Sequence, residues 1–130
     1  MGKFIADTVH EKGLNEIATG DLITLCEGQP VSYAEAVGLK SAAGKRLGGN
    51  ALTPGDGNGD FTLADGDVSG RKITVEEQTG TVAESGAADH VAIVDTVTSE
   101  LLLVTTMASQ AVVGGNDYTI AAFDYEIPDQ

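Results

Sequence analysis

The residues best suited to binding an ion lie in one short acidic stretch near the middle of the chain. They are Asp56, Asn58 and Asp60, each separated from the next by a glycine. Side-chain oxygens at every second position can converge on a hard cation, as the first ligands of a calcium loop do. Phe61 stands where such a loop needs glycine, and Asp67 stands where it needs glutamate. The same residue types are ordinary turn formers, so a turn and a calcium site are both open interpretations.

The second possible chemistry is that of a thiol. The chain has one cysteine, Cys26, and two histidines, His10 and His90. A zinc site needs several such ligands at close spacing, which this sequence lacks. A histidine can activate a thiol as a nucleophile, so a Cys26–His90 pair is the one enzyme-like arrangement to consider. Ile23 and Leu25 lie just before Cys26, which favours a buried thiol in a strand.

The glycine-rich segments do not match nucleotide-binding loops. Residues 48–50 and 55–59 both lack the lysine and the serine or threonine that close a phosphate-binding loop. The chain also has no Gly-x-Ser-x-Gly pattern of the kind that carries a nucleophilic serine. The sequence therefore gives no reason to expect an enzyme or a cofactor.

Two short helices are expected in the first part of the chain. Asp7 or Thr8 can cap a first helix, and Gly20 can end it. Ser32 with Glu35 three residues later forms a capping box for one helical turn over residues 33–37. A short apolar run between the two helices, residues 21–26, is typical of a strand.

Residues 38–59 are rich in Gly, Ala and Ser, which predicts a long surface loop or an extended arm. Leu39, Leu47 and Leu52 are the only large aliphatic residues in it. Because an arm commonly serves a contact, these leucines are candidate partner-contact residues. Phe4 and Ile5 near the start of the chain are candidates of the same kind.

From Asp60 onward the pattern is β throughout. Short apolar runs alternate with turn signals at regular spacing, which favours an antiparallel β-sandwich or a jelly-roll-like fold. Residues 91–94 and 101–104 are continuous apolar runs, typical of central strands covered on both faces, and residues 95–100 between them form a polar hairpin connection. We expect a single, mainly β domain over residues 1–130. It has a helix, arm and loop region at 1–59 and a β body at 60–130.

Net charge restricts the class of partner. Seven Lys and Arg against twenty Asp and Glu give a formal net charge of −13, and aromatic residues make up only 5% of the chain. An acidic surface repels nucleic-acid phosphates and anionic lipid, so neither is an expected partner. No apolar segment is long enough to span a membrane, and no signal peptide is visible, so we expect synthesis in a cytoplasm.

Several stretches spread over the chain are distinctive as strings of residues. They are Glu27-Gly28-Gln29-Pro30 with Tyr33-Ala34-Glu35-Ala36, Gly59 to Asp67 with Ser69-Gly70-Arg71-Lys72, Ala88-Asp89-His90-Val91-Ala92, Leu101 to Thr106 with Ser109-Gln110-Ala111, and Ala122 to Ile127. Together they resemble a family of small structural proteins encoded by tailed bacteriophages and prophages, over nearly the whole chain. The family is not associated with any enzyme.

The resemblance implies a virion structural protein, first of all a decoration or cement protein on the head surface. Its expected partner is the lattice of the major capsid protein, and it is expected to form a homo-oligomer. A tail or fibre-base component is the alternative within the same class. A glycan- or calcium-binding module built on the loop around Asp56 is the alternative from another class.

Overall fold

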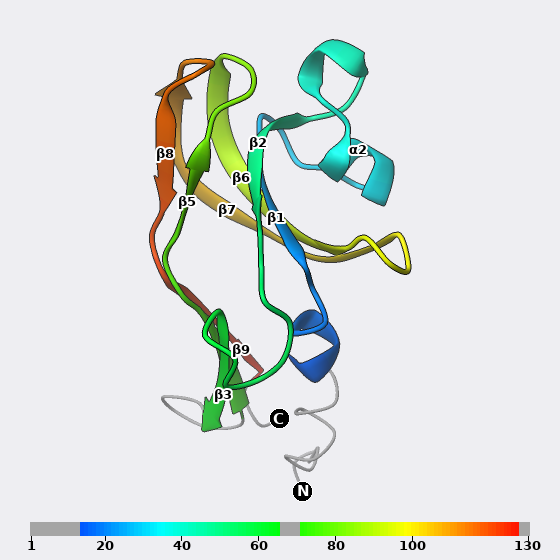
Figure 1. The fold of residues 1–130 in the computed structure, drawn as a ribbon, viewed down its shortest axis with the longest axis vertical. Helices are drawn as coiled ribbons and strands as arrows, with labels where there is room; N and C mark the ends of the chain where they lie inside the picture. Colours follow the sequence, from blue (N-terminus) through cyan, green and yellow to red (C-terminus); the bar gives the residue numbers. More distant parts are fainter. Residues whose placement is uncertain (1–13, 66–70, 128–130) are drawn as a thin grey trace, which may run out of the picture.

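The computed structural model describes residues 14–65 and 71–127. It is mainly β with antiparallel sheets and short helices, as the sequence predicts (Figure 1). The strands are β1 (Leu22–Cys26), β2 (Arg46–Ala51), β3 (Phe61–Asp65), β4 (Arg71–Val75), β5 (Gln78–Thr81), β6 (Gly86–Asp95), β7 (Glu100–Val112), β8 (Asp117–Ile120) and β9 (Phe123–Ile127). The helical segments are residues 14–17, α2 (Tyr33–Val37) and the 3-10 helix η1 (Lys40–Ala42).

The strands form three sheets that share one core. The largest sheet, called sheet A, has the order β2-β1-β6-β7, and the two smaller sheets have the orders β3-β4-β9 and β5-β8. One face of sheet A packs against both smaller sheets, because Ile23 and Ile93 lie in the same buried cluster as Phe61, Ile73 and Ile120. The layered arrangement is that of a β-sandwich.

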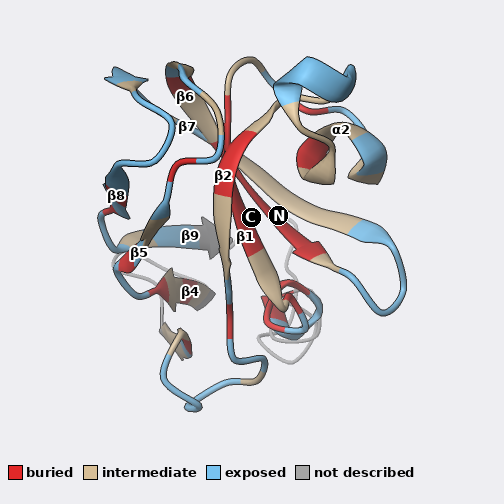
Figure 2. Cartoon of the chain, turned by 45° about the horizontal axis from the view of Figure 1, so that its top comes forward, coloured by how far each residue is buried: buried red, intermediate tan, exposed pale blue. Residues whose placement is uncertain are grey.

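The other face of sheet A is covered by α2. Ala36 of this helix is fully buried and forms a second cluster with Cys26, Ala92 and Val94. The apolar run in β6 is therefore buried on both faces, as predicted for a central strand (Figure 2). The same prediction for residues 101–104 is wrong, because β7 pairs only with β6 and these residues are half-buried at the edge of sheet A.

Helix α2 begins and ends where the capping box predicts. The Ser32 side chain accepts a hydrogen bond from the Glu35 backbone N–H at 3.2 Å. The Glu35 carboxylate accepts from the Val31 backbone N–H at 3.0 Å, one residue before the position that a standard capping box uses. These two bonds satisfy donors that a helix start leaves free.

The predicted arm is a strand of the core. Within residues 38–59, β2 pairs with β1 along its whole length, and Leu47 is 0% and Leu52 5% exposed. Gly48 lies where a side chain would meet the Tyr118 ring, since an added Cβ would be 3.2 Å from its Cε2. Regions 1–59 and 60–130 share sheet A, because β1 of the first region pairs with β6 of the second.

Strands β5 and β8 pack closely at a glycine. Gly80 lies inside β5 opposite Tyr118 of β8. An added Cβ at Gly80 would lie 2.5 Å from the Tyr118 hydroxyl oxygen, so glycine leaves room for the ring. The chain after Asp117 forms two strands, β8 and β9, which belong to different sheets.

Candidate functional site

The three candidate calcium ligands are engaged in hydrogen bonds within their own loop and its neighbours. Asp56 Oδ1 accepts from the Leu63 backbone N–H at 2.9 Å, and the Asn58 amide donates to the Pro54 carbonyl oxygen at 2.8 Å. Asp60 uses both carboxylate oxygens, one for the Thr53 backbone N–H and one for the Gln78 side-chain amide.

These bonds explain the acidic stretch without a metal. The intervening glycines adopt positive φ, with Gly57 at 81° and Gly59 at 115°, which turns the chain sharply at each step. Within residues 14–65 and 71–127, no group of three or more His, Cys, Asp or Glu side chains is placed to hold a metal ion. Asp67, the last candidate position of the calcium pattern, lies outside the described residues.

The two residues of the enzyme-like pair are neighbours in sheet A. Cys26 of β1 lies directly opposite His90 of β6, so their side chains share the α2-covered face. His90 Nδ1 lies 2.7 Å from Asp89 Oδ1, an arrangement that can orient an imidazole. The hydrogen bond with His90 is the main cause that lowers the pKa of the Asp89 carboxyl.

The thiol itself is poorly placed for catalysis. Cys26 is fully buried, and burial raises the pKa of its thiol. Its sulfur lies 3.5 Å from the Thr24 hydroxyl oxygen. A reactive cysteine needs a lowered pKa and access to substrate, and Cys26 has neither.

Asp89 joins two segments that lie far apart in the chain. Its Oδ1 also accepts from the Gly28 backbone N–H at 2.7 Å. In the opposite direction, Glu27 accepts from the Ala87 backbone N–H at 2.8 Å and forms an ion pair with Lys40 at 2.8 Å. These bonds tie the β1–α2 connection to the start of β6, which is a structural role.

The partner-contact candidates fall into three groups. Leu47 and Leu52 are core residues, so their side chains are not available to a partner in the folded chain. Leu39 is half-buried beside η1 and forms an isolated β-bridge with Arg46. Phe4 and Ile5 lie outside the described residues.

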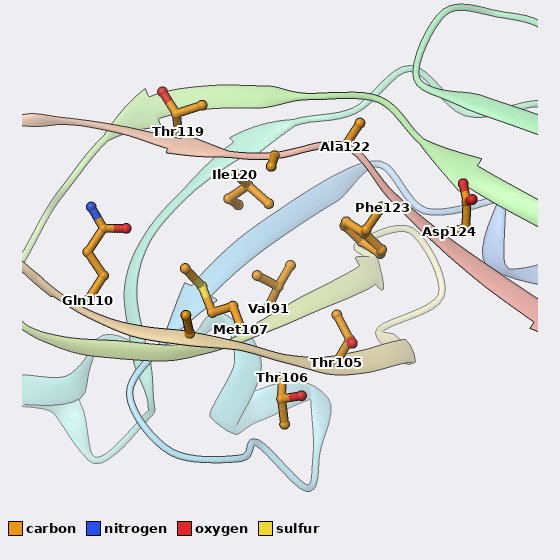
Figure 3. Close-up of a pocket in the computed structure, with 12 residues that line it drawn as sticks. Val91, Thr105, Thr106, Met107, Gln110, Thr119, Ile120, Ala122, Phe123 and Asp124 are labelled. Carbon is orange, nitrogen blue, oxygen red and sulfur yellow. The ribbon is translucent and has the colours of Figure 1, made fainter.

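A cleft of about 390 Å³ lies between β7 and the β8–β9 segment (Figure 3). Val91, Met107, Ile120 and Phe123 point into it from the two sides and form an apolar floor. The other residues that line it are Thr105, Thr106, Ala108, Gln110, Thr119, Ala121, Ala122 and Asp124. Such a lining suits an apolar side chain or an extended peptide better than a charged metabolite.

The cleft contains one ionisable side chain, and that side chain already has partners. Asp124 Oδ1 accepts from the Thr74 hydroxyl at 2.7 Å, and Asp124 Oδ2 lies 3.6 Å from the Lys72 ammonium nitrogen. Among the residues that line the cleft, none pairs an acid with a base, which acid–base catalysis would need. The geometry of the cleft therefore fits the binding of a ligand.

Both long sides of the cleft are strand edges. β7 pairs only with β6, and β8 pairs only with β5, although β7 and β8 follow one another in sequence. Sequence reasoning missed this site because it placed residues 101–104 in a central strand. One signal was available, since no residue between Glu100 and Asp117 carries a charge in a chain of net charge −13.

A scan against protein-family models and searches of curated proteins and of solved structures found no match to this chain.

Of the helices that the structure describes, none is both long and apolar enough to cross a membrane.

Proposed function

We propose that this protein is a structural component of a tailed-bacteriophage virion, and specifically a decoration protein that binds the outer surface of the assembled head. The observation that carries the proposal is the charge of the molecule, −13 on a chain of 130 residues. Like charge keeps copies soluble at the high local concentration of assembly, and it favours docking on a more basic protein surface.

The contacts of the few basic side chains strengthen this argument. Lys40 is paired with Glu27 at 2.8 Å, and Lys72 lies 3.6 Å from Asp124. The charges of Lys40 and Lys72 are therefore balanced by neighbouring acids, and these two lysines form no phosphate-binding patch. A partner with complementary charge is a basic protein surface.

The segments on which the resemblance rests also support a structural role. Gly28 and Asp89 belong to two of the segments on which the resemblance to phage proteins rests, and the Gly28 backbone N–H donates a hydrogen bond to Asp89 Oδ1. The buried Cys26 thiol and the hydrogen-bonded Asp60 carboxylate give the catalytic and calcium-binding alternatives no comparable support.

Quantitative mass spectrometry of purified particles from the source phage tests the proposal. We expect a copy number comparable to that of the major shell protein, with most copies released by a high-salt wash because salt screens the docking charges. A handful of copies per particle would assign the protein to the tail or the fibre base. Absence from particles would overturn the virion role, and the shell protein itself is the internal standard.

A further inference from the structure

The outer edge of β7 is the longest strand edge that the described part of the chain leaves unpaired. β7 runs from Glu100 to Val112, and the sheet order places no strand beyond it. Backbone N–H and C=O groups on such an edge are ready to pair with another strand. Proteins usually protect a free edge with lysine, proline or other charged residues, and residues 101–112 contain none of these.

The other edge strands are protected or short. β8 contains Asp117 and β9 contains Asp124. β3 has only five residues. β5 has only four residues. The opposite edge of sheet A is partly covered, because the Leu47 carbonyl in β2 accepts hydrogen bonds from the backbone N–H groups of residues 83 and 84. The unprotected edge is thus specific to β7.

Charge indicates which partner fits this edge. Two copies of a chain with net charge −13 repel one another over most of their surfaces. The uncharged stretch between Glu100 and Asp117 is the longest in the chain, so a second copy meets least repulsion there. Val113, at the end of β7, is 56% exposed within the same stretch.

We propose that a second copy of this chain pairs its β7 edge with β7 in antiparallel register. Identical strands that pair antiparallel are related by a two-fold axis, so the contact closes as a dimer. Two irregularities in β7 limit its length. Leu102 is unpaired between Leu101 and Leu103, and three residues, 107–109, oppose Asp89 alone. Residues 103–106 between these bulges are the regular segment and form the centre of the contact.

The paired edges would also cover the apolar floor of the cleft, because Thr105 and Thr106 line the cleft and belong to the same regular segment. Sheet A would then continue from one copy into the next through β7. The far ends of the joined sheet are the two partly covered β2 edges, so strand addition stops at two copies. This dimer stands independently of the virion role.

Light scattering coupled to size-exclusion chromatography, over a range of concentrations, measures the association. We expect twice the chain mass for the wild type and the mass of one chain for Thr106→Lys. Thr106 is exposed, and no described residue forms a hydrogen bond with its side chain, so the variant is expected to fold. Thr106→Glu is expected to dissociate as well, because burying either charge at the pairing edge is costly.

Thr62→Lys is the matched control, since Thr62 is an exposed threonine of the edge strand β3 and the change in net charge is the same. We expect it to remain dimeric. Hydrogen exchange at residues 103–106 should be slow in the wild type and in Thr62→Lys, and fast in Thr106→Lys. A monomeric wild type, a mass of three or more chains, or a Thr106→Lys variant that stays dimeric would each overturn the proposal.

Discussion

At the scale of single residues, the side chains that most resemble a functional site are used to hold the fold. Asp60 is the clearest case, because its two oxygens join the loop before β3 to Gln78 of β5. Cys26 and His90 are neighbours in sheet A, yet the thiol is sealed beneath α2. The chemistry of these residue types depends on which groups the fold places beside them.

Replacing Asp60 with alanine should lower the free energy of unfolding by about 1–3 kcal/mol, because the Thr53 N–H and the Gln78 amide lose their acceptor. Urea denaturation measures the change. Asn58→Ala is the control with a smaller expected loss, since its amide makes one exposed bond to Pro54. Millimolar calcium should leave the wild-type melting temperature unchanged. A calcium-dependent rise that disappears in Asp60→Ala would instead establish a metal site.

The Cys26 thiol should react with a disulfide reagent only as fast as the protein opens. Its side chain is fully buried, and burial raises the pKa of the thiol. Thiol titration in buffer and in urea tests this, with complete reaction expected only in urea. Rapid reaction in buffer that is lost in His90→Ala would support a nucleophilic pair.

Asp21 should contribute stability that depends on pH. Its carboxylate accepts from the Thr96 hydroxyl at 2.5 Å and from the Thr96 backbone N–H at 2.9 Å, and the hydroxyl bond is the main cause that lowers its pKa below 3.8. A lowered folded-state pKa gives stability that is complete above 3.8 and is lost as the pH falls through the folded-state value.

The stability difference between wild type and Asp21→Asn isolates this effect from the general charge repulsion. We expect a constant difference from pH 7 down to about pH 5 and a narrowing one below the ordinary carboxyl range. Urea denaturation at several pH values measures it. Thr96→Val removes the hydroxyl partner of Asp21. In that background, the stability lost on replacing Asp21 with asparagine should be smaller at neutral pH. A stability difference between wild type and Asp21→Asn that grows as the pH falls would contradict the lowered pKa of Asp21.

At the scale of elements, β2 shows why a strand can have a loop-like composition. Gly48 and Gly49 lower its intrinsic strand preference, yet an added Cβ at Gly49 would lie 2.8 Å from the Ile23 carbonyl oxygen. The Tyr118 ring lies close to Gly48 and Gly80, and its hydroxyl donates to Asn50 Oδ1 at 2.6 Å. Burial raises the pKa of Tyr118 to about 12, so this donor keeps its proton at neutral pH.

Leu47→Ala should therefore cost about 2–5 kcal/mol of stability, the range for truncating a fully buried leucine. Val31→Ala is the matched control, because Val31 is 75% exposed and its loss should stay within about 0.5 kcal/mol. The urea midpoints of the two variants measure whether Leu47 contributes the stability of a buried core residue. Equal small losses would mean that residues 46–51 behave as an arm after all.

At the scale of the whole molecule, net charge and edge protection act together. The chain has twenty acidic residues, and among the strand edges of its described part the long edge of β7 is the one without a charge between Glu100 and Asp117. Charge repulsion between two copies is weakest along the uncharged β7 edge, so we expect them to associate there. Association and stability should therefore both respond to ionic strength.

Raising sodium chloride from low to physiological ionic strength should raise the melting temperature by a few degrees, because salt screens repulsion among the acidic residues. Thermal unfolding followed by circular dichroism measures it. Thr106→Lys provides the monomeric comparison, in which the rise should persist. A rise confined to the wild type would assign the salt effect to association alone.

The sequence by itself determined the features that depend on local hydrogen bonds and periodicity. Ser32 and Glu35 specify the start of α2 because both bonds close within four residues. The apolar run of β6 specifies a strand buried on both faces, and the Asp95–Glu100 connection specifies the hairpin to β7. The mainly β antiparallel class follows from these same signals.

Only the tertiary structure decided the features that depend on residues far apart in the chain. It made β2 a strand through its pairing with β1, and the Tyr118 ring lies against Gly48 of that strand. It directed the oxygens of Asp60 to Thr53 and Gln78, and it left β7 at the edge of sheet A. Local sequence cannot encode these outcomes, because each depends on a partner brought close only when the sheets assemble.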